Sequence, residues 1–248
     1  MKMLKEAILY SEFPEEIRPL LRELEVEELP LKRSSNPEFI ISYGGDGTFL
    51  TAERDWPEIP KIVLRRSRVC EECKKDVPAK ILHHMVSKKF EIKEFPKLVF
   101  YLGLTEGIAT YDIILRNWNP NQALRFGLHQ GKGGTYPKGE IIGDGLVFGT
   151  RIGAKGYYRS ITREEKISHF ALAFNNPCVP MNPVALEDQF SVEVEILREN
   201  AILCLDNLPS FWFLRAGDQF QVKKHHQKTR VIDFLEYYCE PCQKELSY

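Results

Sequence analysis

The sequence has 248 residues, of which 43% are hydrophobic and 28% are charged, and its formal net charge is -1. This length suffices for two modest domains or one large one, and the composition is that of an ordinary packed globular protein. With 34 Lys and Arg against 35 Asp and Glu, the chain lacks the positive excess of a general nucleic-acid or membrane-surface binder. We therefore expect no nucleic-acid partner and no membrane partner.

The beginning of the sequence does not resemble a signal peptide. The apolar run at residues 7–10 is short, and acidic residues and a proline follow it. A signal peptide needs a longer apolar stretch and a small-residue cleavage site. No apolar run approaches the roughly eighteen residues of a membrane-spanning helix. These features predict a cytoplasmic protein.

Apolar strands alternate with amphipathic helices in the first part of the chain. Strands are predicted at residues 7–10, 26–31, 39–42 and 62–64. Helices are predicted after a Ser11 cap, after Thr48, and over residues 77–88. This alternation predicts an α/β domain with a parallel sheet at residues 1–91.

The pattern changes near residue 90, where short strand-like runs separated by Gly, Asn and Pro begin. Strands are predicted at residues 98–102, 111–115, 123–128, 140–150, 170–174, 190–197, 202–205, 219–223 and 230–235. This spacing is typical of an antiparallel, sandwich-like β-rich domain, which we place at residues 92–236. Residues 237–248 then form a C-terminal tail.

The most informative motif is the run Gly44-Gly45-Asp46-Gly47-Thr48, which joins a predicted strand to a predicted helix. Glycines allow positive φ and let a phosphate approach without meeting a Cβ. The helix that follows offers free N–H groups and the positive end of its dipole. Asp46 inside the turn is expected to be free to accept a proton from a sugar hydroxyl or to hold a metal ion. The alternative is a tight turn in which Asp46 only caps the helix.

This run, followed by Phe49, Leu50 and Ala52, resembles the signature of the NAD kinase, diacylglycerol kinase and phosphofructokinase superfamily. A second block runs from Gly143-Asp144-Gly145-Leu146-Val147 to Thr150, Gly153 and Tyr157, and resembles the NAD kinase block GDGLIVSTPTGSTAY. A third, Leu214 with Gly217-Asp218, resembles the Leu-x-x-Gly-Asp stretch near that family's C-terminal end. The three blocks occur in family order, so the chain resembles a divergent NAD kinase.

The resemblance implies transfer of a phosphoryl group from ATP or polyphosphate, with Mg²⁺, to the 2′-hydroxyl of the adenosine ribose of NAD. It implies a dinucleotide between an α/β domain and a β-rich domain, a tail that returns to the first domain, and Asp46 as the catalytic base. We also expect a homo-oligomer. The implied nucleotide-binding residues are Gly44, Gly45, Gly47, Thr48, Asp112, Asp144, Thr150, Lys155 and Tyr157.

Three departures from the family pattern concern the substrates. The family's Asn-Glu pair aligns with Tyr111 and Asp112, and a tyrosine cannot mimic an asparagine amide. Arg151 and Lys155 replace small residues of the second block, either as ligands of a nucleotide or polyphosphate or as solvated surface charges. The basic run at residues 65–68 stands where the family keeps a glycine-rich loop beside the donor phosphates, and it is either a phosphate-binding loop or a basic surface loop.

Two other functions remain open at this level. One is a kinase of the same fold that acts on a sugar or a lipid, although the second block argues against a lipid kinase. The absence of GGxxPG elements argues against a phosphofructokinase. The other is a catalytically degenerate protein that binds NAD, NADP or another nucleotide.

Four of the six cysteines form two CxxC pairs, Cys70 with Cys73 and Cys239 with Cys242. Four thiolates suit a tetrahedral Zn²⁺ site, which would be structural because it leaves no open position for substrate. A disulfide within or between the pairs and four reduced thiols are the alternatives. Cys178 and Cys204 are interpreted as small buried hydrophobic residues.

Overall fold

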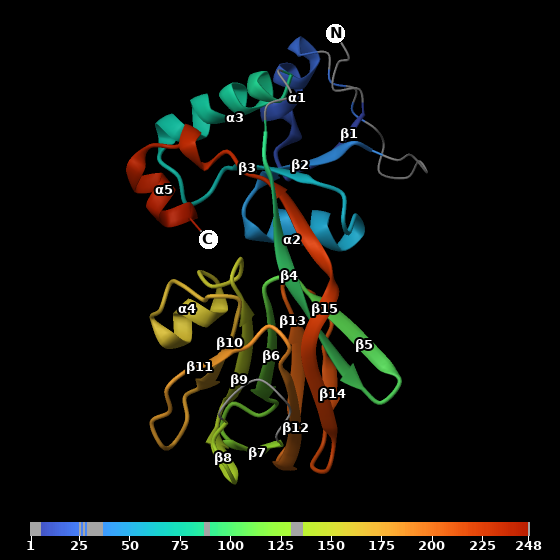
Figure 1. Cartoon of the computed structure of the whole chain (residues 1–248), viewed down its shortest axis with the longest axis vertical. Coiled ribbons are helices and arrows are strands. Elements are labelled where there is room, and N and C mark those ends of the chain that lie inside the picture. Colours follow the sequence, from blue (N-terminus) through green and yellow to red (C-terminus); the bar gives the residue numbers. More distant parts are fainter. Residues whose placement is uncertain are drawn as a thin grey trace. The chain divides into compact units, whose positions relative to one another are not determined.

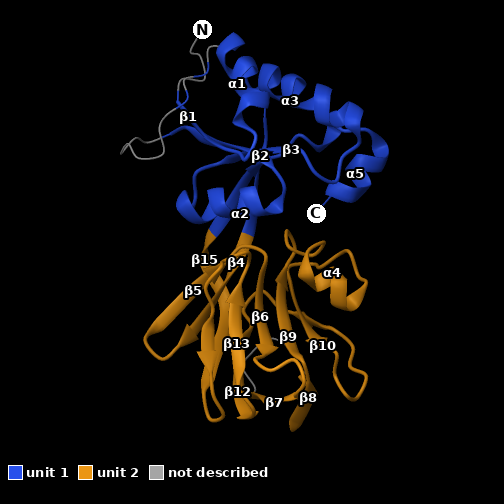
Figure 2. Ribbon diagram, turned by 180° about the vertical axis from the view of Figure 1, so that it is seen from behind, with its two compact units in different colours: residues 1–95, 228–247 blue, residues 96–227, 248 orange. Residues whose placement is uncertain are grey.

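The structure is a computed structural model that describes residues 6–24, 26, 28, 37–86, 90–129 and 136–247. Its chain forms two compact units, Met1–Phe95 with Lys228–Ser247 and Pro96–Gln227, which Figure 2 draws in blue and orange. Residues 228–236, expected in the β-rich domain, belong to the first unit instead. The strand predicted at residues 26–31 lies mostly outside the described residues.

A parallel sheet forms the centre of unit 1. Its strands are β1 (Ala7–Tyr10), β2 (Phe39–Gly44), β3 (Lys61–Arg65) and the last residues of β15 (Gln219–Ile232), in that order. Ala7 and Leu9 join one apolar cluster, whereas Ile8 and Tyr10 join another. Successive side chains of a strand face opposite sides of the sheet. Both faces are therefore buried, which explains the continuous apolar runs of these strands.

Helices cover both faces of this sheet. Figure 1 shows α1 (Pro14–Glu23) and α3 (Glu71–Val86) on one face and α2 (Asp46–Asp55) on the other. The prediction that Ser11 caps α1 was wrong, because the N-cap residue is Phe13 and Ser11 Oγ accepts a hydrogen bond from the Phe13 N–H at 2.9 Å. Pro14 occupies the start of the helix, where its missing N–H costs nothing.

The end of the chain packs onto unit 1. It comprises the 3-10 helix η1 (Leu235–Tyr237) and the helix α5 (Glu240–Leu246). Phe234, Tyr238 and Leu246 belong to the same apolar cluster as Val77 and Ile81 of α3. Burial of these side chains accounts for the return of the tail to the first unit.

Unit 2 consists of two antiparallel sheets packed face to face. The first has the order β11 (Val184–Leu186), β10 (Phe170–Asn175), β9 (Gly145–Thr150), β6 (Asp112–Asn117), β13 (Ala201–Leu205) and β14 (Trp212–Leu214). The second contains the first part of β15, then β12 (Ser191–Arg198), β7 (Leu124–His129) and β8 (Glu140–Gly143), with β4 (Ile92–Leu102) and β5 (Thr105–Ala109) alongside. Phe148 of one sheet and Val194 of the other share one apolar core. The expected sandwich-like architecture is confirmed.

Several elements of unit 2 differ from the predicted ones. The runs predicted at residues 219–223 and 230–235 are one strand, β15, which pairs with β12 in its first half and with β3 at its end. The run predicted at residues 140–150 is two strands, β8 and β9, separated at Asp144. Strands β5, β11 and β14 and the short helix α4 (Tyr157–Thr162) were not predicted from the sequence.

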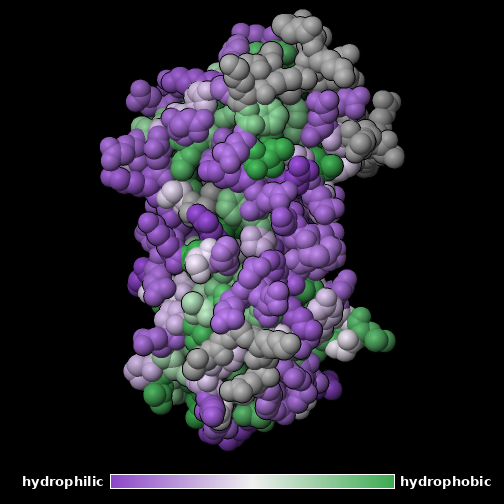
Figure 3. Space-filling view, in the orientation of Figure 1, coloured by the Kyte–Doolittle hydropathy of each residue, from purple (hydrophilic) through white to green (hydrophobic). Residues whose placement is uncertain are grey.

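The surface is mostly polar on the face that Figure 3 shows. One hydrophobic exception is the turn between β4 and β5, where Leu104 is fully exposed. Within the described part of the chain, no helix has the length and apolar character needed to cross a membrane.

Candidate functional site

The glycine run lies at the junction of β2 and α2 in unit 1. Gly44 is the last residue of β2, Gly45 is the N-cap residue of α2, and Asp46 is its first residue. The helix therefore begins inside the motif rather than after Thr48. The first-turn N–H groups of a helix lack intrahelical partners, and the carboxyl edge of a parallel sheet is where α/β proteins bind their ligands. Gly44, Gly45, Gly47 and Thr48 thus lie together in a turn that suits an anion.

Two arginines hold the Asp46 carboxylate. Arg65 Nη1 lies 2.7 Å from Asp46 Oδ1, and Arg68 Nη1 lies 3.2 Å from Asp46 Oδ2. The Asp46 side chain is 25% exposed and that of Arg65 is 8% exposed. The expectation of a carboxylate free to meet a sugar hydroxyl was therefore wrong, since a hydroxyl has to approach an oxygen atom that already binds a guanidinium.

The loop at residues 65–68 lies directly against the glycine run. The Arg66 N–H donates to the Gly44 carbonyl at 3.0 Å, and a Cβ added to Gly45 would lie 2.9 Å from Ser67 Oγ. Arg66 binds both carboxylate oxygens of Glu16. Since Arg65 and Arg68 bind Asp46, each arginine of the loop has an acidic partner. This contact, with a hydrogen bond from Tyr43, lowers the pKa of Glu16 to about 2. We call residues 65–68 the arginine loop.

A pair of carboxyl groups, the buried Asp112 and the half-buried Asp206, marks one end of β6 in unit 2. Asp206 accepts hydrogen bonds from the backbone N–H groups of Thr110, Tyr111 and Asp112, at 2.9, 2.7 and 3.0 Å. Burial raises the pKa of Asp112 well above its usual range, and the charge of Asp206 adds to this effect. Burial also raises the pKa of Asp206, but the three N–H donors and Lys97 oppose that rise. Of the two carboxyl groups, Asp112 is therefore the one whose protonated form its surroundings favour more strongly.

The end of β9 lies beside this pair. Thr150 is fully buried, its hydroxyl donates to the Thr110 carbonyl at 2.7 Å, and the same oxygen accepts the Gly153 N–H at 3.2 Å. A Cβ on Gly153 would lie 2.5 Å from the Tyr111 carbonyl oxygen, so only glycine fits there. The Thr150 hydroxyl thus connects the β6 strand start to the segment that carries Lys155. Lys155 and Tyr157 are both half-buried, and Tyr157 is the first residue of α4.

Asp144 lies away from Thr150, at the end of β9 where Asn175 contacts the Tyr157 hydroxyl. Asp144 directly precedes β9, and Thr150 is the last residue of that strand. A strand rises about 3.3 Å per residue, so the six steps between them correspond to roughly 20 Å. The amide nitrogens of Asn117 and Asn176 donate to the Asp144 carboxylate at 3.5 and 3.2 Å. In unit 2 the structure brings Asp112 and Thr150 together and places Asp144 at the other end of the strand.

The four cysteines of the CxxC pairs converge in unit 1. Their sulfur atoms all lie within 4.8 Å of one another, and Cys70 Sγ lies 3.9 Å from Cys239 Sγ. Tetrahedral Zn²⁺ with Zn–S distances of about 2.3 Å separates its ligand sulfurs by about 3.8 Å. Cys70 directly precedes α3 and Cys239 is the N-cap residue of α5. The residues present therefore fit a tetrathiolate metal site.

Backbone donors already surround these sulfur atoms. The N–H groups of Cys70, Cys73 and Cys239 donate to sulfurs of the cluster at 3.2, 3.4 and 3.3 Å. The Cys73 N–H is the main cause that lowers the pKa of the Cys70 thiol to about 7. Such donors favour thiolates, the ligand form of cysteine, whereas burial acts against them and raises the pKa of the Cys73 thiol to about 12 and that of Cys242 above its usual value. All six cysteines are free thiols in the structure.

The interpretation of Cys178 as a buried hydrophobic residue was wrong, because Cys178 is exposed, and Cys204 is only partly buried. Cys178 belongs to the loop between β10 and β11 rather than to a strand. The sequence reading also missed Asp206, the pairing of Arg65 and Arg68 with Asp46, and Tyr238. Nothing in their local sequence signals these contacts, since each joins residues that are distant along the chain or on separate elements.

Comparison with known proteins agrees with this architecture. No protein-family model matches the chain. A curated NAD kinase of Thermomicrobium roseum is 23% identical over 208 residues, which cover 78% of this chain and 69% of that protein. The crystal structure of an NAD kinase from Archaeoglobus fulgidus in complex with ATP has a TM-score of 0.76 and 18% identity, covering 97% of this chain and 99% of that one. The crystal structure of yeast NADH kinase complexed with NADH has a TM-score of 0.72 and 14% identity, covering 94% of this chain and 84% of that one.

The two-unit architecture with a glycine turn between β2 and α2 is thus the fold of the NAD kinases. The sequence similarity to a curated NAD kinase, together with this fold, supports membership of the NAD kinase family.

Proposed function

We propose that the protein is a kinase that transfers a phosphoryl group from ATP to the 2′-hydroxyl of the adenosine ribose of NAD. The observation that carries this proposal is the glycine turn at the start of α2, with Asp46 as the first helical residue, in a chain with the NAD kinase fold. Phosphoryl transfer depends mainly on positioning and on neutralising charge. A helix N-terminus with two arginines beside it supplies both.

Asp46 is the proposed base. Its carboxylate accepts a hydrogen bond from Arg65 and forms an ion pair with Arg68, so the ribose hydroxyl has to share an oxygen or displace Arg68, whose contact of 3.2 Å is the longer one. Mg²⁺ usually binds through substrate phosphates and one or two carboxylates. Because both Asp46 oxygens bind arginine, we expect Mg²⁺ to arrive with the ATP phosphates, where it neutralises developing charge.

Unit 2 supplies the other proposed ligands of the nucleotide. A protonated Asp112 can donate a hydrogen bond to an acceptor such as a ribose oxygen, which an ionised carboxylate cannot do. Lys155 and Tyr157 offer an ammonium group and a phenol on the segment after β9. The contribution of Thr150 is to hold that segment, since its hydroxyl is bonded within the protein. Asp144 stays a predicted ligand on the Tyr157 side of this set, since its N–H donates to the Asn175 carbonyl at 2.9 Å and Asn175 Nδ2 lies 3.5 Å from the Tyr157 hydroxyl.

NADP formation tests the proposal. NAD, ATP and Mg²⁺ are supplied, and the product is measured with an NADP-specific dehydrogenase. Parallel reactions replace ATP by polyphosphate, or NAD by NADH or a sugar. We expect NADP with ATP, and Asp46→Asn should abolish most of it. Nucleotide binding without any product would contradict the proposal and indicate a degenerate nucleotide-binding protein. Polyphosphate use, a homo-oligomer and a cytoplasmic location stay predictions.

We also propose that Cys70, Cys73, Cys239 and Cys242 bind a structural Zn²⁺. The convergence of four sulfurs from two CxxC pairs supports this, and four thiolate ligands leave no position for a substrate. Zn²⁺ would supply charge and geometry, holding the start of α5 against the start of α3. Elemental analysis of protein purified without chelator should find about one zinc per chain. A content below about 0.2 equivalents would contradict the proposal.

A further inference from the structure

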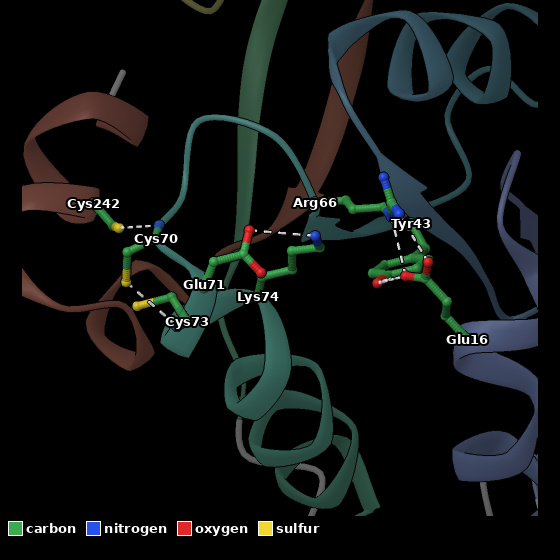
Figure 4. Close-up of polar contacts among 8 residues, drawn as sticks. All are labelled: Glu16, Tyr43, Arg66, Cys70, Glu71, Cys73, Lys74 and Cys242. Carbon is green, nitrogen blue, oxygen red and sulfur yellow. Dashed lines mark hydrogen bonds and ion pairs between the residues drawn. The ribbon is translucent and has the colours of Figure 1, made fainter.

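The C-terminal tail contacts the backbone at the first residue of the arginine loop and again at Cys70, two residues beyond the last one. At the first contact, the Arg65 backbone N–H donates to the hydroxyl of Tyr238 at 3.1 Å, and Tyr238 is buried. At the second contact, the Cys70 N–H donates to Cys242 Sγ at 3.2 Å, and the tail cysteines meet those of α3. Figure 4 shows Cys242 beside Cys70 and Cys73, at the start of α3. Tyr238 and Cys239 are adjacent in sequence, so one short segment makes both contacts.

The part of the loop between these two contacts carries the groups that bind Asp46. Arg65 ends β3, Arg68 follows three residues later, and Cys70 stands two residues beyond, just before α3. Arg68 has positive φ, a conformation that L residues rarely adopt without surrounding constraints. A loop of this length between two fixed ends has few conformations, whereas release of one end would allow many.

The ion pairs of Arg65 and Arg68 alone do not explain why both guanidinium groups are held at the Asp46 carboxylate. Arginine loses much rotamer entropy when it is held in one geometry, and a single ion pair at a partly exposed carboxylate adds little stability. The Arg68 side chain is 39% exposed. Backbone anchors at Arg65 and Cys70 reduce the entropy that the side chains have to lose. The tail therefore fixes the position from which both guanidinium groups reach Asp46.

We propose that Tyr238 is a positioning residue for the glycine turn, and that it acts together with the metal site through the arginine loop. This inference rests on the proposed function of Asp46 and on the proposed Zn²⁺. The tail acts through its contacts with the backbone N–H groups of Arg65 and Cys70. It sets the backbone of Arg65 and of Cys70, and thereby the direction of the two guanidinium groups that orient the carboxylate.

The matched variants are Tyr238→Phe and Tyr237→Phe. Both delete one hydroxyl from neighbouring tail residues, and the Tyr237 hydroxyl lies 2.6 Å from His84 Nδ1, away from the arginine loop. Hydrogen–deuterium exchange measures the effect without reference to activity. Tyr238→Phe, or removal of zinc by a chelator, should raise exchange in peptides that cover residues 44–48 and 65–70. Tyr237→Phe should leave these peptides unchanged. Peptides of β12 serve as an internal reference.

Kinetics supply the second measurement. Tyr238→Phe should lower kcat about tenfold, because a small misplacement of a catalytic group is costly, while KM for NAD and ATP stays within about twofold. Tyr237→Phe should keep the wild-type kcat. A purely structural role for Tyr238 predicts equal losses of thermal stability in both variants and no change in kcat at a temperature where both are folded. That result, or exchange changes confined to residues 70–73 and 239–242, would overturn the inference. If the wild type forms no NADP, the proposed function fails while the exchange data still decide the coupling.

Discussion

Arg65 donates from Nη1 to Oδ1 of Asp46 over 2.7 Å, and this contact joins the end of β3 to the first residue of α2. The two residues come from separate strand–helix units of the sheet, yet they form one charged group at its carboxyl edge. Arg68 completes the group from the other side of the carboxylate.

Replacement of Asp46 by asparagine should lower kcat by about 10²–10⁴, the usual contribution of general-base catalysis, with little change in stability. Asparagine keeps the shape of the side chain and loses the charge that binds the arginines. Asp55→Asn is the control, because Asp55 ends the same helix and only accepts a hydrogen bond from Tyr10. Initial rates and thermal unfolding of both variants are to be measured. Turnover by Asp46→Asn at the wild-type rate would refute its role as the base.

Replacement of Cys242 by serine should remove zinc and lower the unfolding temperature. A ligand present at a hundred times its Kd stabilises the folded state by about 2.7 kcal/mol, and each kcal/mol is worth about 2–4 °C for a chain of this size. Cys178→Ser is the control, because Cys178 is exposed and lies outside the cluster. Zinc content and unfolding temperature are measured together. Equal effects of the two substitutions would argue against the metal site.

The buried carboxyl of Asp112 predicts a pH-dependent stability. Because its folded pKa is raised above the unfolded value, its contribution is fully present below about pH 4 and is lost as pH rises towards the folded pKa. Asp112→Asn removes this loss because asparagine does not ionise. The free energy of unfolding of the variant, relative to that of the wild type, should therefore be higher at pH 8 than at pH 5. Urea unfolding at the two pH values checks this expectation.

The matched control for that experiment is Asp188→Asn. The hydrogen bond from Lys224 lowers the pKa of Asp188, so its contribution has the opposite sign: it is present above the unfolded pKa and lost as pH falls. Asp188 is exposed, and the effect should be small. A stability difference for Asp112→Asn that does not depend on pH would contradict the protonated state proposed here.

Replacement of Thr150 by valine should destabilise the protein by about 1–3 kcal/mol, since it removes the buried hydroxyl that donates to the Thr110 carbonyl. Thr150→Ser keeps the hydroxyl and should retain most of the stability. Denaturant unfolding of both variants measures the difference. If valine instead raises KM for the nucleotide with unchanged stability, the hydroxyl contacts the ligand directly.

Much of the fold follows from patterns that are local in the sequence. The apolar runs and helical spacing of the first part predicted the parallel sheet and its helices, because residues a few positions apart share a face of a strand or a helix. The glycine run joins β2 to α2 as predicted, although α2 begins at Asp46 and not after Thr48. The missed strands β11 and β14 have three residues each and lie at the edges of their sheet, where they are too short for a periodic pattern.

The sequence by itself therefore determined the strand–turn–helix motif that suits a phosphate, and two cysteine pairs with metal-ligand spacing. Only the tertiary structure decided that the pairs converge, that Asp46 is bound by two arginines, and that Tyr238 reaches Arg65. The physical reason is the distance along the chain over which each interaction acts. Turn geometry and helix capping depend on adjacent residues, whereas these contacts depend on the apolar packing of η1 and α5 onto α3. That packing is a property of the assembled core, and no stretch of the sequence encodes it alone.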